Sequence, residues 1–291
     1  MKTPLLEDIT NRLASISDTP ALDASVLLAH IINKPRTWVI AHPNPSLKSE
    51  QQLSLRDALE QLERGESFPY ILGHWEFFGL DFEITPDVLI PRPETETLVE
   101  KAIAWLQASH ERSPSTTLRV ADVGTGSGAI AVTLAMHIPA TYILATDISL
   151  PALKVAKRNA IKFDVAGRID FVQCDLLPTH HDPLPTDLHF DLICANLPYI
   201  PAKTLQTLTV FGKEPTIALD GGEDGFSLIR RLLKIAPEWL APNGMILLEI
   251  EDSLGNQALS LAYNSLSEST IHLHQDLTGR DRLLEILIHD L

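Results

Sequence analysis

The fold is decided by the stretch Leu118-Arg119-Val120-Ala121-Asp122-Val123-Gly124-Thr125-Gly126-Ser127-Gly128. Its first half is an apolar run typical of a buried strand, and an apolar helical stretch, residues 129–134, follows the glycines directly. Glycine lacks a Cβ atom, so this turn lets the backbone take positive φ values and approach a ligand closely. A strand, a glycine turn and a helix in this order predict the ligand-binding edge of a parallel sheet.

Strands and helical segments alternate along the chain on the C-terminal side of this turn. Strands are expected near residues 118–123, 141–146, 168–173, 189–195 and 244–250. This alternation predicts an α/β fold with a mostly parallel, Rossmann-like sheet. Two last strands, near residues 270–276 and 282–288, are too close in sequence for a parallel crossover, so we expect an antiparallel C-terminal hairpin.

The N-terminal part of the chain has a different pattern. Apolar residues recur at spacings of three and four in residues 21–32 and 53–62, which predicts a small helical domain over residues 1–70. Residues 71–93 combine aromatic and β-forming residues with glycine and proline, and we interpret them as a β-hairpin and linker. The α/β domain is then expected over residues 94–291.

Composition excludes several classes of protein. The chain has 291 residues, 45% of them hydrophobic, and a formal net charge of -15 without a cluster of Lys and Arg. Direct nucleic-acid binding is therefore not expected. No apolar run approaches the roughly 18–20 residues of a membrane span, and the N-terminus lacks the apolar core of a signal peptide, so we expect a cytoplasmic monomer without membrane contact.

The glycine turn is followed by a carboxylate that suits a nucleoside. Asp147 ends the next expected strand, where it can accept hydrogen bonds from both hydroxyls of a ribose. The turn also fits the dinucleotide pattern of an NAD-dependent enzyme. Asp122, just before the first glycine, favours the cationic S-adenosylmethionine over a pyrophosphate. The expected cofactor is thus S-adenosylmethionine, with these cofactor-binding residues: Asp122, Gly124, Thr125, Gly126, Ser127, Gly128, Asp147, Asp175 and Asn196. For Asp175, which would bind the adenine amino group, an ordinary exposed position is an equal alternative.

A second motif, Asn196-Leu197-Pro198-Tyr199, follows another apolar strand and supplies the expected catalytic residues. An amide nitrogen is a poor nucleophile unless two acceptors hold its N–H groups. The Asn196 side-chain oxygen and the Leu197 carbonyl can be these acceptors, since Pro198 holds Leu197 extended. Tyr199 can pack on the planar group. By itself the motif is as typical of a strand-exit turn, but together the two motifs predict methyl transfer to a planar nitrogen.

Several segments together resemble the release factor glutamine methyltransferases, which modify the glutamine of a Gly-Gly-Gln tripeptide. The glycine turn, Asp147 and the Asn196 motif match that family, as do these further segments: residues 70–73, 76–80, 88–96, 214–215, 218–222 and 276–282. The resemblance implies a class I methyltransferase fold, a release factor as the protein partner and an N-terminal domain that docks it. Asn196, Leu197, Pro198 and Tyr199 are expected to bind substrate. Arg92, Glu94 and Glu96 could contact the entering substrate loop, with a solvated hinge as an equal alternative.

The sequence departs from the family pattern at Leu197, where the family has proline, and at Glu251, where it has glycine. Asn-Leu-Pro-Tyr also resembles the motif of ribosomal RNA adenine dimethyltransferases. An adenine N6-type RNA or DNA methyltransferase therefore stays as the alternative, and a non-catalytic binding module is a third. No metal site is expected, because the pairs His180-His181 and His272 with His274 lack further ligands.

Overall fold

The structure is a computed structural model that describes residues 4–179 and 188–289. The chain divides into two compact units, Met1–His74 and Trp75–Leu291, and each is described by itself. The pair His180-His181 lies outside the described residues, as does most of the acidic, proline-rich loop around it. The domain limits predicted at residues 70 and 93 stay predictions.

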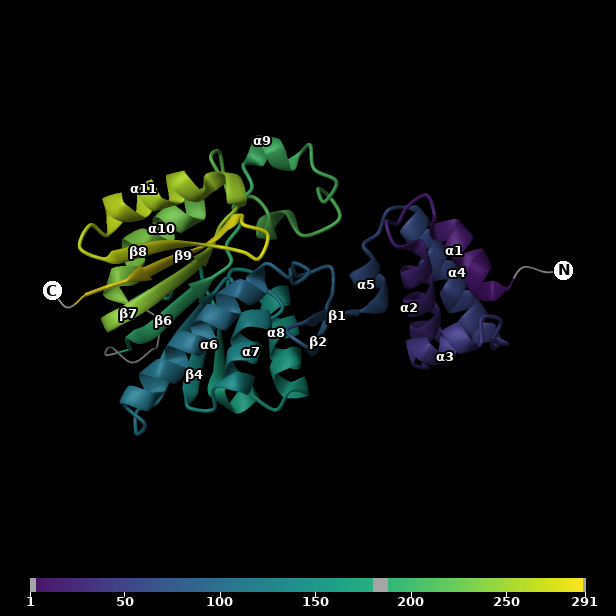
Figure 1. Cartoon of the computed structure of the whole chain (residues 1–291), viewed down its shortest axis with the longest axis horizontal. Coiled ribbons are helices and arrows are strands. Elements are labelled where there is room, and N and C mark those ends of the chain that lie inside the picture. Colours follow the sequence, from purple (N-terminus) through teal and green to yellow (C-terminus); the bar gives the residue numbers. More distant parts are fainter. Residues whose placement is uncertain (1–3, 180–187, 290–291) are drawn as a thin grey trace. The chain divides into compact units, whose positions relative to one another are not determined.

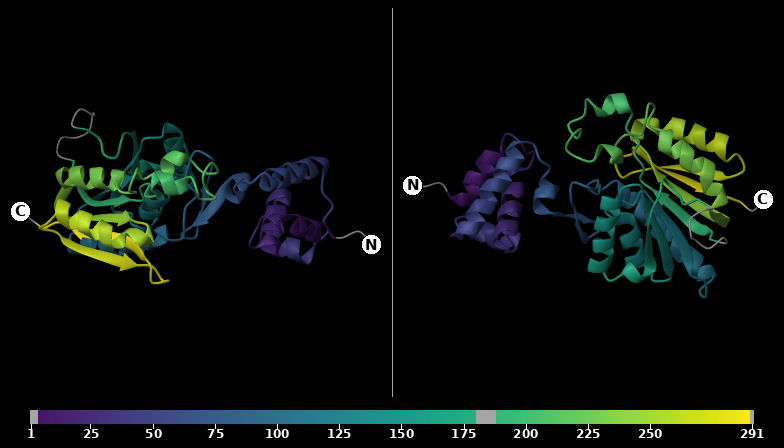
Figure 2. Two further views of the ribbon diagram at one scale, coloured as in Figure 1. Left: turned by 90° about the horizontal axis from the view of Figure 1, so that it is seen from above. Right: turned by 180° about the vertical axis from the view of Figure 1, so that it is seen from behind.

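The first unit is helical, as the apolar spacing predicts. Its helices are α1 (Leu5–Leu13), α2 (Pro20–Ile32), α3 (Arg36–Ala41), α4 (Ser49–Glu63) and α5 (Phe68–Leu72) (Figure 2). Leu27 and Leu28 of α2 are fully buried with Ile9 of α1. Helix α5 extends into the segment interpreted as hairpin and linker, because Pro69 suits a first helical turn and Gly73, at φ 74°, ends the helix.

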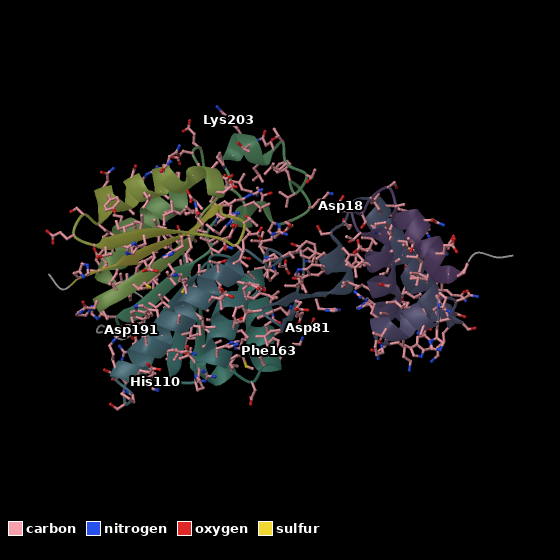
Figure 3. All side chains as sticks on the ribbon, viewed as in Figure 1. Asp18, Asp81, His110, Phe163, Asp191 and Lys203 are labelled. Carbon is pink, nitrogen blue, oxygen red and sulfur yellow. The ribbon has the colours of Figure 1, made fainter. Side chains whose placement is uncertain are left out.

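A two-stranded hairpin of β1 (His74–Phe77) and β2 (Leu80–Glu83) follows α5. Phe82 is fully buried and its ring lies 5.3 Å from that of Phe163, which Figure 3 labels at the end of α8. Asp81, on the opposite face of the strand, makes an exposed ion pair with Lys162. The alternation of polar and apolar residues thus packs one face of β2 against α8.

The second unit is an α/β fold around a seven-stranded sheet with the strand order β5-β4-β3-β6-β7-β9-β8. Its strands are β3 (Leu118–Val123), β4 (Thr141–Asp147), β5 (Ile169–Gln173), β6 (Phe190–Ala195), β7 (Leu240–Glu249), β8 (Thr270–Gln275) and β9 (Asp281–Leu287). Strands β3 to β7 pair in parallel, whereas β9 is antiparallel to both neighbours. The predicted antiparallel C-terminal hairpin is confirmed.

Helices cover both faces of this sheet. Figure 1 shows α6 (Thr95–Arg112), α7 (Ala129–His137) and α8 (Leu150–Lys162) together on one face. Helices α10 (Ser227–Ile235) and α11 (Gly255–Ser265) lie on the other, and the short α9 (Ala202–Leu205) precedes α10. Because both faces are covered, the central strands β3, β4 and β6 are buried almost throughout.

The strand order reverses at β3. From β3 the chain adds β4 and then β5 on one side, and it returns to add β6 and then β7 on the other. A crevice opens at such a reversal, outside the carboxyl ends of the strands. Residues that follow β3 and β6 therefore meet there.

Asn159 of α8 holds the hairpin and the glycine turn together. It is fully buried, and its amide nitrogen donates to the carbonyls of Glu83 at 3.0 Å and Ser127 at 2.9 Å. Its side-chain oxygen accepts from the Glu83 N–H at 2.7 Å. With two donated bonds and one accepted bond, the Asn159 amide thus joins α8 to β2 and to the glycine turn.

Asn159→Ala is expected to lower the free energy of unfolding by about 2–4 kcal/mol, since it leaves buried backbone groups unpaired. The neighbouring Arg158→Ala removes only an ion pair with Glu83 whose two side chains are 47% and 38% exposed, and it is expected to cost less than about 1 kcal/mol. Urea unfolding of both variants measures the difference. Equal losses would contradict this role of Asn159.

Candidate active site

A cavity of about 230 Å³ lies where β3, β4 and β6 end. Ten of the residues that the sequence predicts for the site line it: Arg92, Gly124, Thr125, Gly126, Ser127, Asp147, Asp175, Asn196, Leu197 and Pro198. Four others are not among the lining residues: Glu94, Asp122, Gly128 and Tyr199. The cavity thus brings the glycine turn and the second motif into one site.

The two motifs touch each other at Gly124. This residue has φ 75°, and a Cβ atom added to it would lie 3.2 Å from the Cδ2 atom of Leu197. Leu197 is only 3% exposed and belongs to the core of the unit. Glycine at 124 therefore permits both the turn and the close packing of the acceptor motif against it.

Asp122 lies beneath the turn. Its Oδ2 atom accepts from the Thr125 hydroxyl at 2.6 Å and from the Ala131 N–H at 3.1 Å, which fixes the turn to the start of α7. Burial raises the pKa of this carboxyl to about 6, against the opposing effect of these hydrogen bonds. Asp122, which the sequence assigns to the cofactor site, thus holds the turn in place by hydrogen bonds and does not line the cavity.

Asp147 lies at the end of β4 and faces the cavity. Its Oδ2 atom accepts from the Gly126 N–H at 2.9 Å and its Oδ1 atom from the Ser149 N–H at 2.8 Å. Burial raises its pKa above the ordinary range, and the backbone hydrogen bonds oppose that shift. Each oxygen of an ionised carboxylate accepts more than one hydrogen bond, so Asp147 keeps capacity for a diol.

Asp175 is ion-paired at the rim of the cavity. Its Oδ2 atom lies 2.7 Å from the Arg231 guanidinium, with both side chains half exposed, and Arg231 also lines the cavity. Sequence reasoning missed Arg231, because an arginine pair on the exposed face of a helix carries no signal of its own. The rim of the cavity therefore carries a hydrogen-bond acceptor, Asp175, beside a donor, Arg231.

Arg92 is bound to a buried carboxylate. Glu214, which is 8% exposed, accepts from the Arg92 guanidinium and from the Ile90 N–H, the latter at 3.1 Å. The segment before α6 is thus fixed to the segment before α10. Glu94 is exposed at the start of α6 and does not line the cavity, so these two residues lie in different surroundings.

Asn196 follows β6, and its amide nitrogen donates to the Thr95 hydroxyl at 3.0 Å. Tyr199 donates from its hydroxyl to Glu249 at 3.3 Å, and burial with the nearby Glu249 charge raises its pKa. Thr95 and Glu249 have no role in the sequence-based site. Glu249 is a single polar residue between Leu248 and Ile250, and that contrast is its one signal, whereas Thr95 stands between Glu94 and Glu96 and has no such signal.

Neither a metal centre nor a membrane span is present in residues 4–179 and 188–289. No group of three His, Cys, Asp or Glu side chains lies together there as in a metal site. No helix in the same ranges is both long and apolar enough to cross a membrane.

Comparison with known proteins gives matches over both units. The family described as the PrmC N-terminal domain matches residues 4–73, and a methyltransferase domain matches residues 120–210. A release factor glutamine methyltransferase of Rhodopirellula baltica is 36% identical over 93% of this chain and 90% of its own. One of Moorella thermoacetica is 37% identical over 97% and 96%.

Solved structures share the fold. The human methyltransferase 10 domain containing protein is 20% identical, and the match covers 73% of this chain and 89% of that one with a TM-score of 0.51. At this identity the likeness shows the fold alone, a class I methyltransferase sheet.

Proposed function

This chain belongs to the family of release factor glutamine methyltransferases, and we propose that it methylates the side-chain amide nitrogen of a glutamine in a peptide chain release factor. The methyl donor in this proposal is S-adenosylmethionine. The observation that carries it is the single cavity lined by the glycine turn, Asp147 and the Asn196 motif. The family likeness supplies the class of substrate.

The acceptor geometry fits a planar amide. The side-chain nitrogen of Asn196 donates to Thr95, so the side-chain oxygen of Asn196 is left to accept from a substrate N–H. Leu197, held extended before Pro198, offers its backbone carbonyl to the second N–H. With both N–H groups held, the nitrogen faces the methyl donor, and catalysis is positioning for an in-line displacement.

The cavity also fits the proposed cofactor. Its wall is largely apolar and carries the Asp147 carboxylate, which suits an adenosyl group with a ribose diol. S-adenosylmethionine supplies an electrophilic methyl group on a cationic sulfur. When it is bound, Asn196 and Leu197 would hold the amide nitrogen toward that methyl group, and the nitrogen would exchange one proton, released to water, for the methyl group carried by the sulfur.

Incubation with labelled methyl donor and purified release factor, followed by peptide mass spectrometry, tests the function. We expect the label on a glutamine side chain. RNA and DNA serve as competing acceptors, because the same motif suits the N6 amino group of adenine. Label in nucleic acid with an unmodified glutamine would overturn the proposal in favour of an adenine methyltransferase.

We propose further that the N-terminal unit docks the release factor. The match of residues 4–73 to the PrmC N-terminal domain supports this role, as do its exposed apolar side chains, among them Leu22, Ile40 and Leu53. The full chain is then expected to have a lower KM for the intact factor than for a short glutamine peptide. Equal KM values would contradict docking outside the active site.

Asp147→Asn is expected to raise the Kd of the cofactor about 10- to 100-fold, because hydrogen bonds to a charged acceptor contribute about 1.5–3 kcal/mol. Titration calorimetry with S-adenosylhomocysteine measures it. Asp170→Asn is the matched control. Asp170 is exposed on β5, accepts a hydrogen bond from the Tyr142 hydroxyl and does not line the cavity. An unchanged Kd in Asp147→Asn would remove Asp147 from the cofactor site.

A further inference from the structure

A chain of polar side chains extends behind the Asn196 motif into the core. It consists of Asn196, Thr95 at the start of α6, Glu249 at the end of β7, and Tyr199. Thr95 is 4% exposed and Glu249 is 2% exposed. Polar groups are costly to place at such depth unless they are well paired, so this cluster calls for a role.

The hydrogen-bond directions in this chain are set by Glu249. The hydroxyl of Thr95 favours the ionised form of the Glu249 carboxyl, as a donor to an anion does, and an ionised carboxylate only accepts hydrogen bonds. Toward Asn196 the same hydroxyl is then an acceptor only, and it takes the Asn196 amide N–H at 3.0 Å. The carboxylate thus decides which end of the Asn196 amide points to Thr95.

We propose that Thr95 and Glu249 are positioning residues that turn the Asn196 side-chain oxygen, rather than its nitrogen, toward the substrate amide. This inference rests on the proposed function, because an amide substrate presents N–H groups that need acceptors. A reversed Asn196 would place its NH₂ group against the substrate NH₂ group, and two donors repel. The correct rotamer alone does not prevent this, since the two amide ends have nearly the same size.

Stability does not explain the buried carboxylate. The Oε2 atom of Glu249 is buried and has no hydrogen-bond partner among the described residues. Burial raises the pKa of this carboxyl to about 7, although Thr95, Arg282 and Tyr199 favour its ionised form. Replacing a buried charge by an apolar residue of similar volume is often neutral or stabilising, so the retained charge favours a role in orientation.

The charged and titratable groups that act on Glu249 come from three directions. Arg282 of β9 stabilises the carboxylate, Glu94 before α6 opposes it, and Tyr199 donates to it. Protonated Glu249 can itself donate to Thr95, which frees the Thr95 proton to point at Asn196. We therefore expect kcat to fall below about pH 7 as Asn196 loses its fixed orientation.

Thr95→Val and Thr95→Ser form the first test, with intact release factor as substrate. Valine keeps the volume but removes the hydroxyl, and kcat is expected to fall about 10- to 100-fold. KM for the release factor and the cofactor Kd are expected to stay within about 2-fold, because no binding contact is lost. Serine keeps the hydroxyl and is expected to restore kcat. A wild-type kcat in Thr95→Val, or equal losses in both variants, overturns the inference.

Glu249→Gln forms the second test and does not depend on the behaviour of Thr95→Val. Glutamine has the same shape without the buried charge, and its amide either accepts from or donates to Thr95. We expect a lower kcat at pH 8 and loss of the decline below about pH 7. A decline that persists in Glu249→Gln overturns the inference. Wild-type protein that leaves the glutamine unmodified contradicts the proposed function instead.

Discussion

Asn196→Ala is expected to lower kcat about 10²- to 10³-fold, while the cofactor Kd changes by less than about 3-fold. In the proposed function, the variant removes one of the two acceptors that hold the substrate amide, and the Leu197 carbonyl alone would not fix the nitrogen. Asn196 also lines the cavity, but its observed hydrogen bond is to Thr95. The variant should therefore lower kcat much more than it weakens cofactor binding. Single-turnover kinetics and titration calorimetry measure the two quantities separately.

Asn256→Ala is the control for this variant, because Asn256 is exposed on α11 and does not line the cavity. It is expected to leave both quantities unchanged. Losses of equal size in turnover and in cofactor binding by Asn196→Ala would show that Asn196 mainly holds the cofactor. The assignment of Asn196 as a substrate acceptor would then be withdrawn.

Gly221→Ala is expected to lower the free energy of unfolding by about 1–3 kcal/mol and to lower kcat about 100-fold. A Cβ atom at this position would lie 2.7 Å from the Cα of Tyr199 and 2.8 Å from the Gly225 carbonyl oxygen. Both are backbone atoms, so no side-chain rotation relieves the overlap. The N–H of Gly221 also donates to the Ile200 carbonyl at 2.8 Å. A shift of the backbone at Gly221 would therefore also move the residues that follow the acceptor motif.

Gly167→Ala is the matched control. Neither glycine has a positive φ, and a Cβ atom at 167 would meet nothing within 4 Å. The control is therefore expected to raise the free energy of unfolding slightly, by about 0.4–1 kcal/mol, because alanine lowers the conformational entropy of the unfolded chain. Thermal unfolding and kcat of the two variants separate a general effect of alanine from the close approach at Tyr199. Wild-type values for Gly221→Ala would contradict the prediction.

The sequence predicts the order and type of the strands because buried parallel strands are short apolar runs between turns. The start of β7 shows where this fails. Ala241-Pro242-Asn243-Gly244 is typical of a turn, so the sequence predicts a strand from residue 244, yet β7 begins at Leu240. Leu240 pairs with Phe190 and the register then shifts, so this stretch is an irregularity inside the strand. Pairing with β6 outweighs local preference.

The residues that follow strand ends could be assigned to one cavity from sequence, because parallel strands bring their carboxyl ends to one edge. Thr95, Asn159 and Glu249 could not. Each acts through a partner from a distant segment, as Asn159 does with Glu83, and the neighbours of a polar residue in the sequence do not reveal that partner. Their roles follow from hydrogen-bond direction, which depends on three-dimensional contacts.

The position of β3 between β4 and β6 has a consequence for the order of folding. One helix separates β3 from β4, whereas β6 follows only after two further strands, and closing the longer loop costs more chain entropy. We therefore expect the half of the cavity around Asp147 to form before the half around Asn196. During synthesis, a chain that ends before β6 is then expected to hold the edge proposed to bind the nucleoside, without the acceptor motif. Methyl transfer is then expected only after the second half of the sheet has folded.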